Sequence, residues 1–195
     1  MTKDDLIAFE DEMTLLFEQG HIKAPLHLAG GNEDILIDLF KEINPKNDWV
    51  LVGWRSHFHC LLKGVPADQV RHAICQGHSI SLAFPYYKVL CSGIVGGIAP
   101  IGVGIAAGLK RTGQPGKVWV FVGDMTAYSG IFSESTRYAI RHNLPIEFVI
   151  EDNGLSVCTD TEASWGTEVH RKNIIRRYSY KMTRPHVGIG KHIAF

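Results

Sequence analysis

The chain has 195 residues, of which 45% are hydrophobic, and its 20 Lys and Arg residues balance its 20 Asp and Glu residues. This length and composition predict one globular domain that spans residues 1–195. A net charge of +0 gives no sign of the basic surface that nucleic acids and anionic membranes attract, so we expect no nucleic acid and no membrane partner.

The first half of the chain predicts three helices and one short strand. Thr2, followed by apolar residues at helical spacing, predicts a capped amphipathic helix that ends at Gly20. The elements expected after it are a helix at 32–43, a strand at 50–53 and a helix at 68–76. Residues 77–92 show no clear period and predict an ordered loop.

A helix rich in glycine and alanine is predicted over residues 98–110. Each glycine inside a helix costs about 1 kcal/mol relative to alanine, so close approach of another helix or of a cofactor is expected to compensate. The apolar run at 94–109 is shorter than the roughly twenty residues that cross a bilayer. We therefore expect a buried helix rather than a membrane span.

The second half predicts a strand at 118–122, a helix at 131–142 and a strand at 146–150. This β-α-β order is typical of a parallel sheet. The expected fold class is α/β, a three-layer sandwich with a mostly parallel sheet. After Gly166 the pattern weakens and favours only a last strand at 178–182.

Polar residues directly follow both strands of this unit: Gly123 and Asp124 follow the first, and Asn153 follows the second. The carboxyl ends of parallel strands form the edge where such sheets bind ligands. A carboxylate, an amide oxygen and the carbonyl oxygen of Leu155 are hard ligands suited to Mg²⁺ on a diphosphate. The spacing predicts a phosphorylated cofactor bound through a metal. The alternative is that Asp124 only caps the next helix.

This segment resembles the thiamine diphosphate signature, in which Gly-Asp-Gly is followed by Asn-Asn. Residues 93–159 resemble the alpha subunit of the E1 component of 2-oxo acid dehydrogenases, and the same constellation occurs in split transketolases. The resemblance implies a thiamine diphosphate-binding fold with Mg²⁺. Two positions depart from it, because Met125 stands at the second glycine and Asp152 at the first asparagine. A β-carbon at Met125 is expected to shift the loop or its φ angle.

The resemblance implies roles for further residues. Arg55 would make charge-assisted hydrogen bonds to the diphosphate, and main-chain groups of Gly93 and Val95 would hold the aminopyrimidine ring. The implied cofactor-binding residues are Trp54, Arg55, Gly93, Val95, Gly123, Asp124, Met125, Thr126 and Asn153. The implied metal ligands are Asp124, Asn153 and Leu155.

Two histidines are candidate catalytic residues. His186 lies where the family has a mobile histidine loop, so it would bind a substrate carboxylate or phosphate or transfer a proton. His57 ends the segment Trp54-Arg55-Ser56-His57, which resembles the aromatic-Arg-x-His segment of the family. A zinc site is disfavoured, since no cysteine or carboxylate at ligand spacing completes a tetrahedral set with the histidines at 57, 59, 72 and 78.

By resemblance, the reaction is oxidative decarboxylation of a 2-oxo acid with acyl transfer to a lipoyl carrier. Ketol transfer on a ketose is the first alternative, and a non-catalytic binding or scaffolding module of the same fold is the second. Enzymes of this cofactor class also need a pyrimidine-binding domain, and this chain is too short to contain both domains. By comparison with the family pattern, the chain is expected to be shortened at its C-terminus. The resemblance therefore implies a separately encoded beta subunit and an α₂β₂ assembly that buries the glycine-rich helix.

The cysteines and the N-terminus bear on the compartment. No C-x-x-C spacing occurs, so we expect buried free thiols rather than a disulfide framework at Cys60, Cys75, Cys91 and Cys158. The first five residues are polar and acidic after the methionine, with no apolar segment of a secretory signal. We expect a cytoplasmic protein.

Overall fold

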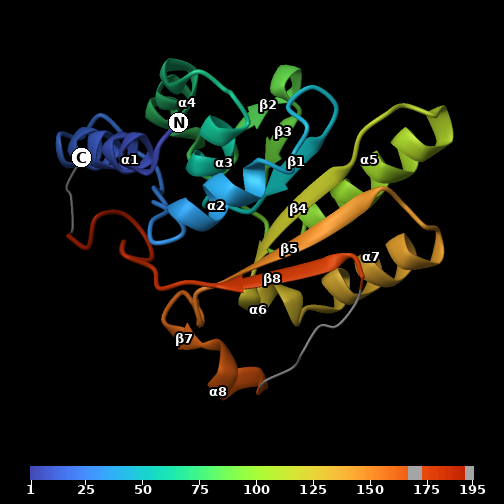
Figure 1. Ribbon diagram of the computed structural model, residues 1–195. Coiled ribbons are helices and arrows are strands. Elements are labelled where there is room, and N and C mark those ends of the chain that lie inside the picture. Colours follow the sequence, from blue (N-terminus) through green and yellow to red (C-terminus); the bar gives the residue numbers. More distant parts are fainter. Residues whose placement is uncertain (167–172, 192–195) are drawn as a thin grey trace.

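The computed structural model describes residues 1–166 and 173–191, and a six-stranded sheet lies at its centre (Figure 1). The strand order is β2-β3-β1-β4-β5-β8, and every neighbouring pair is parallel except β2 with β3. The strands are β1 Trp49–Val52, β2 Ala83–Phe84, β3 Val89–Cys91, β4 Val118–Gly123, β5 Ile146–Asp152 and β8 Ile175–Ser179. The expected mostly parallel α/β sheet is confirmed.

Helices cover both faces of the sheet, which makes three layers (Figure 1). One face carries α5 (Ile98–Thr112) and α7 (Gly130–Arg141). The other face carries α1 (Lys3–Glu18), α2 (Glu33–Phe40), α3 (His57–Leu62) and α4 (Ala67–Ala73). Alternation along β4 supplies both cores, because Trp119 and Phe121 face the second group of helices while Val120 faces the first.

The remaining elements are short. They are a π-helical turn at Ile74–His78, a 3₁₀ turn at Pro85–Tyr87, the helix α6 at Asp124–Ala127, the hairpin of β6 (Leu155–Ser156) with β7 (Thr159–Asp160), and α8 at Thr161–Trp165. Two of them, α6 and the hairpin, follow directly on β4 and β5 and so surround the edge where both strands end.

The first helix begins as expected. The Thr2 side chain accepts a hydrogen bond from Asp5 N at 3.2 Å, and the Asp5 side chain accepts one from Thr2 N at 2.7 Å. This reciprocal pair is a capping box, which satisfies two N–H groups at the start of the helix. Helix α1 ends at Glu18, and Gly20 follows with a φ of 74°.

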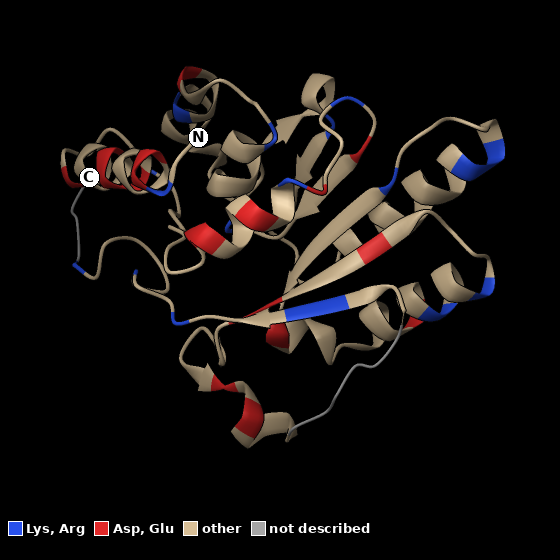
Figure 2. Ribbon diagram, viewed as in Figure 1, with Lys and Arg blue, Asp and Glu red and all other residues tan. Residues whose placement is uncertain are grey.

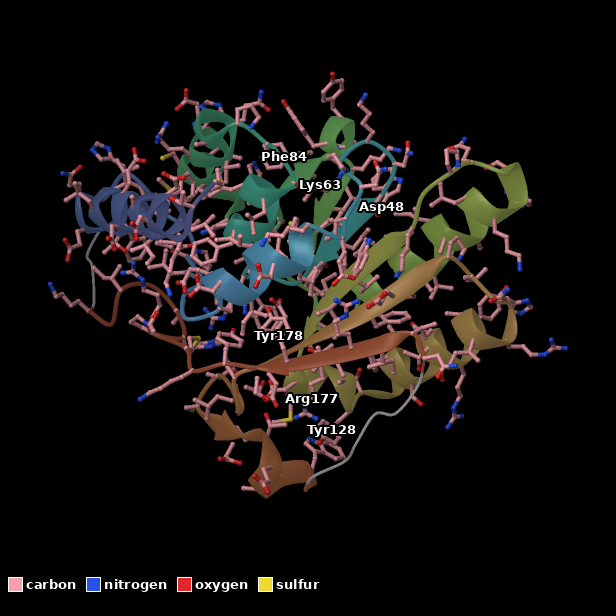
Figure 3. All side chains as sticks on the ribbon, in the orientation of Figure 1. Asp48, Lys63, Phe84, Tyr128, Arg177 and Tyr178 are labelled. Atoms are coloured by element: carbon pink, nitrogen blue, oxygen red, sulfur yellow. The ribbon has the colours of Figure 1, made fainter. Side chains whose placement is uncertain are left out.

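Two of the expected elements were wrong. Residues 77–92 are not a loop throughout, because β2 and β3 lie there and β3 pairs with β1. Strands of two and three residues are too short to show a period. The last strand is Ile175–Ser179 rather than 178–182, because its Arg176 and Arg177 interrupt the apolar pattern. Figure 3 shows Arg177 and Tyr178 on opposite sides of this strand.

The glycine-rich helix α5 is buried on one face only, so the expectation of a buried helix was wrong for its other face. A β-carbon on Gly102 would lie 2.5 Å from Val120 Cγ2, which shows how closely this helix approaches the sheet. A β-carbon on Gly104 or Gly108 would meet nothing within 4 Å. Gly102 therefore approaches a strand rather than the helix or cofactor that was expected to compensate for glycine.

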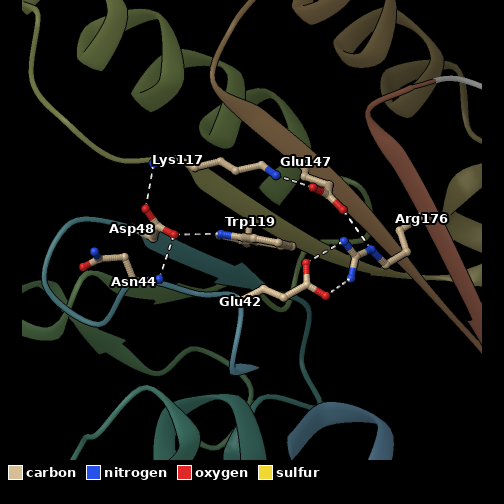
Figure 4. Close-up of polar contacts among 7 residues, drawn as sticks. All are labelled: Glu42, Asn44, Asp48, Lys117, Trp119, Glu147 and Arg176. Atoms are coloured by element: carbon tan, nitrogen blue, oxygen red, sulfur yellow. Dashed lines mark hydrogen bonds and ion pairs between the residues drawn. The ribbon is translucent and has the colours of Figure 1, made fainter. Parts of the chain in front are cut away.

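At the amino ends of the strands, Trp119 lies in a polar network (Figure 4). Its Nε1 donates to Asp48 Oδ2 at 3.0 Å, and Asp48 Oδ1 accepts from Lys117 N at 2.9 Å. The Lys117 ammonium lies 4.2 Å from the centre of the Trp119 ring, and Glu147 forms ion pairs with both Lys117 and Arg176. The ion pair of Glu147 with Arg176 thus ties β8 to the body of the sheet. The basic residues of β8 appear blue in Figure 2.

Within residues 1–166 and 173–191, no helix is long and apolar enough to cross a bilayer. All four cysteines are free thiols. The expectation that they are buried was right for Cys60, whereas Cys75 and Cys91 are half-buried and Cys158 is exposed.

Candidate functional site

A cleft opens at the carboxyl ends of β1, β4 and β5 and encloses about 830 Å³, including its open mouth. The strand register brings these ends together, since Val52 of β1 pairs with Phe121 of β4 and Gly123 of β4 pairs with Glu151 of β5. Residues far apart in the sequence, from Ala29 to His186, line it. The cleft lies at the edge where parallel sheets bind ligands.

Asp124 is the most unusual polar residue of the cleft. It follows β4 directly, begins α6 and is 3% exposed. Its Oδ2 is buried without a hydrogen-bond partner among the described residues, and burial raises the pKa of the carboxyl group. A buried carboxylate oxygen without a donor is costly, and a bound cation would relieve that cost.

Asn153 and Leu155 form a turn beside Asp124. The Asn153 Oδ1 accepts a hydrogen bond from Leu155 N at 3.0 Å, which is an Asx turn. Within the described residues there is no cluster of three or more His, Cys, Asp or Glu side chains that could hold a metal. An ion here would have one carboxylate with amide and carbonyl oxygens, a set that fits Mg²⁺ completed by phosphate oxygens.

The two departures from the signature have clear structural outcomes. Met125 lies inside α6 and has a negative φ, which a residue with a β-carbon adopts without strain. Asp152 points to the face of β5 opposite Glu151 and forms an ion pair with Arg177 at 2.7 Å. It also accepts a hydrogen bond from Ser179 at 3.1 Å. Asp152 therefore holds β8 to β5.

Arg55 and His186 form the other wall, and the His27 ring packs against His186. Arg55 Nη1 donates to Leu28 O at 2.8 Å, and its Nη2 donates to His186 O at 2.7 Å and lies 3.0 Å from His186 Nδ1. The His27 ring stands 5.3 Å from the ring of His186. Burial, and then the Arg55 charge, lowers the pKa of His27 to about 4 and also lowers the pKa of His186. At pH 7 this wall carries one fixed positive charge and two neutral imidazoles.

The cleft gathers most of the residues predicted from the sequence. Those that line it are Trp54, Arg55, Val95, Gly123, Asp124, Met125, Thr126, Asn153, Leu155 and His186. Gly93 is not among the lining residues, and a β-carbon there would lie 3.0 Å from Ile80 Cδ1. The neighbours of Gly93 in the sequence, Ile94 and Val95, are at the rim.

His57 does not line the cleft. It is completely buried, with Nδ1 2.9 Å from Glu10 Oε1 and Nε2 3.0 Å from Ser79 Oγ. Glu10 also accepts a hydrogen bond from Ala29 N at 3.2 Å. These contacts describe a core histidine that joins α1 to the segment beside the cleft.

Sequence reasoning passed over several residues of the site. Asn32, Glu151 and Tyr180 line the cleft, and His27 supports its basic wall. Strand alternation could have found Glu151, because it lies two residues before Asn153 and points to the same side. The sequence carries no motif that marks Asn32, Tyr180 or His27, whose positions depend on packing.

The sequence model of the dehydrogenase E1 component family matches residues 1–173. The chain belongs to the dehydrogenase E1 component family. This confirms the resemblance found in the sequence. The E1-family chain is 29% identical over 177 residues to the pyruvate dehydrogenase E1 component subunit alpha of Zymomonas mobilis, covering 85% of this chain and 47% of that protein.

A second relative is the subunit alpha of acetoin:2,6-dichlorophenolindophenol oxidoreductase from Cupriavidus necator. It is 31% identical over 172 residues, covering 83% of this chain and 50% of that protein. The E1-family chain therefore spans about half the length of the curated relatives it matches. A solved structure from Mycobacterium smegmatis, described as a thiamin diphosphate-dependent enzyme, also matches. The match covers 68% of this chain and 22% of the chain in that structure, with 22% sequence identity and a TM-score of 0.46. The family assignment does not depend on it.

Proposed function

We propose that this chain is the alpha-type subunit of a thiamine diphosphate- and Mg²⁺-dependent enzyme that decarboxylates a 2-oxo acid and transfers the acyl group. The observation that carries the proposal is the meeting of Asp124, Asn153 and Arg55 in one cleft at the ends of parallel strands. The name of one relative, a pyruvate dehydrogenase subunit, supports this class of chemistry, because pyruvate is a 2-oxo acid.

The residues of the cleft fit the cofactor. Asp124, Asn153 and the Leu155 carbonyl would hold Mg²⁺, while Arg55 would bind the diphosphate and Val95 the pyrimidine ring. When bound, thiamine diphosphate supplies the nucleophile and the electron sink. The unpartnered Asp124 Oδ2 supports this assignment, because it is an acidic oxygen that no described residue satisfies.

The protein's own contribution is to orient charge and hold a proton. Arg55 is held by the carbonyl oxygens of Leu28 and His186, so its guanidinium is oriented before an anion arrives. Since Arg55 donates to His186 Nδ1, the neutral imidazole carries its proton on Nε2. We infer that His186 presents this N–H to a substrate oxygen.

A separately encoded beta subunit would complete the site in an α₂β₂ assembly. Apolar side chains beside the cleft support this, since Ile94 is 75% exposed, Val95 is 58% exposed and Ile101 is 46% exposed. Ile101 lies on the same face of α5 as Gly104 and Gly108, where a β-carbon would meet nothing within 4 Å. Together these residues form a surface suited to a packed partner.

Calorimetry with thiamine diphosphate and Mg²⁺ tests the proposal, with and without a co-expressed beta-type subunit. The wild type is expected to bind only with the metal, and Asp124→Ala is expected to abolish that binding. Asp38→Ala is the control, because Asp38 is exposed and forms a surface ion pair with Lys41. No binding under either condition would contradict the proposal and favour a non-catalytic module. An unchanged Kd in Asp124→Ala would remove Asp124 from the site.

A further inference from the structure

The floor of the cleft carries a carboxylate that the proposed function leaves without a role. Glu151 lies on β5, lines the cleft, and has a side chain that is only 12% exposed. Its contacts all go to one oxygen: Tyr178 donates its hydroxyl to Oε1, Asn32 Nδ2 lies 3.4 Å from Oε1 and His59 Nε2 lies 3.3 Å from it. The other oxygen, Oε2, receives no hydrogen bond from the residues that the structure describes. Oε1 of this carboxylate is thus held by the protein, and Oε2 is available to accept a hydrogen bond from a bound molecule.

The residues around Glu151 Oε1 are themselves buried, and Tyr178 and Asn32 bind it, whereas His59 Nε2 lies nearby without a hydrogen bond to any described residue. Asn32 is 4% exposed and also donates to the Tyr178 hydroxyl at 3.1 Å. His59 is 1% exposed and packs edge-on against Phe121, with ring centres 4.5 Å apart. Burial, and then the charge of Glu151, strongly raises the pKa of Tyr178, which keeps the phenol as a donor. The carboxylate therefore has one orientation in the cleft.

Asn32 adds a second acceptor to the same floor. Its Nδ2 is used by Tyr178 and Glu151, whereas its Oδ1 is buried with no partner among the described residues. Both Asn32 and Glu151 line the cleft. A buried acceptor without a donor is costly, and a donor on a bound molecule would recover that cost.

The cleft therefore has two sides of opposite character: the wall formed by Arg55 and His186 is the first, and the floor formed by Glu151 and Asn32 is the second. Arg55 and His186 offer hydrogen-bond donors and positive charge, while Glu151 and Asn32 offer acceptors and negative charge. An acidic group of a bound molecule is attracted to the first side and repelled by the second. A hydroxyl or amino group is favoured at the second side.

Resting on the proposed function, we propose that Glu151 is a recognition residue whose Oε2 accepts a hydrogen bond from an O–H or N–H donor of the molecule bound in the cleft. The donor belongs either to the cofactor or to the substrate. In the second case the preferred substrate is an acid that carries an additional hydroxyl group on the carbon chain. Its acid group would lie toward Arg55 and its hydroxyl toward Glu151.

Glu151→Gln tests this assignment, because the amide keeps an acceptor for Tyr178 and places an N–H₂ donor where the ligand's donor would be. Glu147→Gln is the matched control: it is the same substitution on the same strand and face, and Glu147 lies outside the cleft lining. Calorimetry gives the Kd of thiamine diphosphate with Mg²⁺. The saturated protein is then titrated with lactate and with glycerate, two unreactive acids that differ by one hydroxyl.

Two results support the proposal. If the cofactor carries the donor, Glu151→Gln weakens thiamine diphosphate binding by roughly tenfold or more, while Glu147→Gln changes it little. If the substrate carries it, the cofactor Kd is unchanged, and the wild type's tighter binding of glycerate over lactate disappears in Glu151→Gln. Should Glu151→Gln fail to fold, Glu151→Asp keeps the charge, withdraws the oxygens by one methylene and is expected to show the same loss.

Two other results overturn it. If both the cofactor Kd and the glycerate preference match the wild type in Glu151→Gln, the recognition role is wrong, while Mg²⁺-dependent binding by the wild type still sustains the proposed function. If the wild type binds no thiamine diphosphate, with or without a beta-type subunit, the proposed function fails and the role of Glu151 fails with it.

Discussion

Arg55 and His186 are 131 residues apart in the sequence and are joined through one nitrogen, Arg55 Nη2, which lies 2.7 Å from the His186 carbonyl oxygen and 3.0 Å from His186 Nδ1. The same guanidinium donates to Leu28 O through Nη1. One side chain thus positions two loops beside the cleft. These contacts with Leu28 and His186 require a planar group with several hydrogen-bond donors, which a guanidinium provides.

Arg55→Lys is expected to weaken thiamine diphosphate binding by about tenfold, because an ammonium keeps the charge but cannot repeat the paired contacts to Leu28 and His186. Calorimetry measures the loss. Arg184→Lys is the control, since Arg184 pairs with the exposed Asp11. Equal affinities for wild type and Arg55→Lys would show that only the charge matters.

Asp124→Asn is expected to stabilise the ligand-free protein while removing its Mg²⁺-dependent binding. Burial raises the pKa of Asp124, so the ionised carboxylate opposes folding at neutral pH, and an amide of the same shape removes that charge. Thermal unfolding without metal checks the first effect, and calorimetry checks the second. A lower melting temperature in Asp124→Asn than in the wild type would contradict the claim that the buried carboxylate opposes folding.

Stability is expected to fall as the pH drops from about 6.5 toward 4. Burial and Arg55 hold the pKa of His27 at about 4 in the folded protein, below its ordinary value of 6.5. Between these values the unfolded chain binds a proton that the folded protein refuses, so acid favours unfolding; above pH 6.5 this contribution is constant. Urea unfolding at several pH values measures the slope. His27→Gln should reduce it, and an identical slope would exclude His27 as the cause.

Gly102 and Gly104 provide a matched pair on α5. Gly104→Ala is expected to stabilise the chain by about 0.5–1 kcal/mol, because its β-carbon meets nothing and alanine favours helix. Gly102→Ala is expected to destabilise it by about 1–3 kcal/mol, because its β-carbon would lie 2.5 Å from Val120 Cγ2. Urea unfolding measures both. The open face at Gly104 also allows a test of assembly. If a beta subunit packs on this face of α5, Gly104→Trp should prevent the two subunits from co-purifying. Normal co-purification would exclude this face of α5 as the interface.

Asp48→Ala is expected to cost about 3 kcal/mol, since it removes the acceptor for Trp119 Nε1 and for the backbone N–H groups of Lys117 and Asn44 (Figure 4). Unfolding followed by Trp fluorescence measures it. Asp34→Ala should cost little, because the ion pair of Asp34 with Lys3 is exposed. A loss as small as that of Asp34→Ala would show that water replaces Asp48.

Part of the fold and of the site followed from local pattern. The capped helix α1, the strands β4 and β5 and the helix α7 between them each have a period long enough to read. Asp124 and Asn153 could be placed at one edge because their strands were predicted to be parallel. In contrast, β2, β3 and β8 are short or carry charges that obscure their pattern.

The amino-acid sequence by itself was enough for the family, the layer order of the β-α-β unit and the residues that follow its strands, because these depend on neighbours in the chain. Only the tertiary structure decided that His57 lies in the core between Glu10 and Ser79, that Arg55 meets His186, and that Glu151 is held on one oxygen. Those outcomes depend on burial and on contacts between segments far apart in the chain, and no local period or spacing encodes which of them will meet.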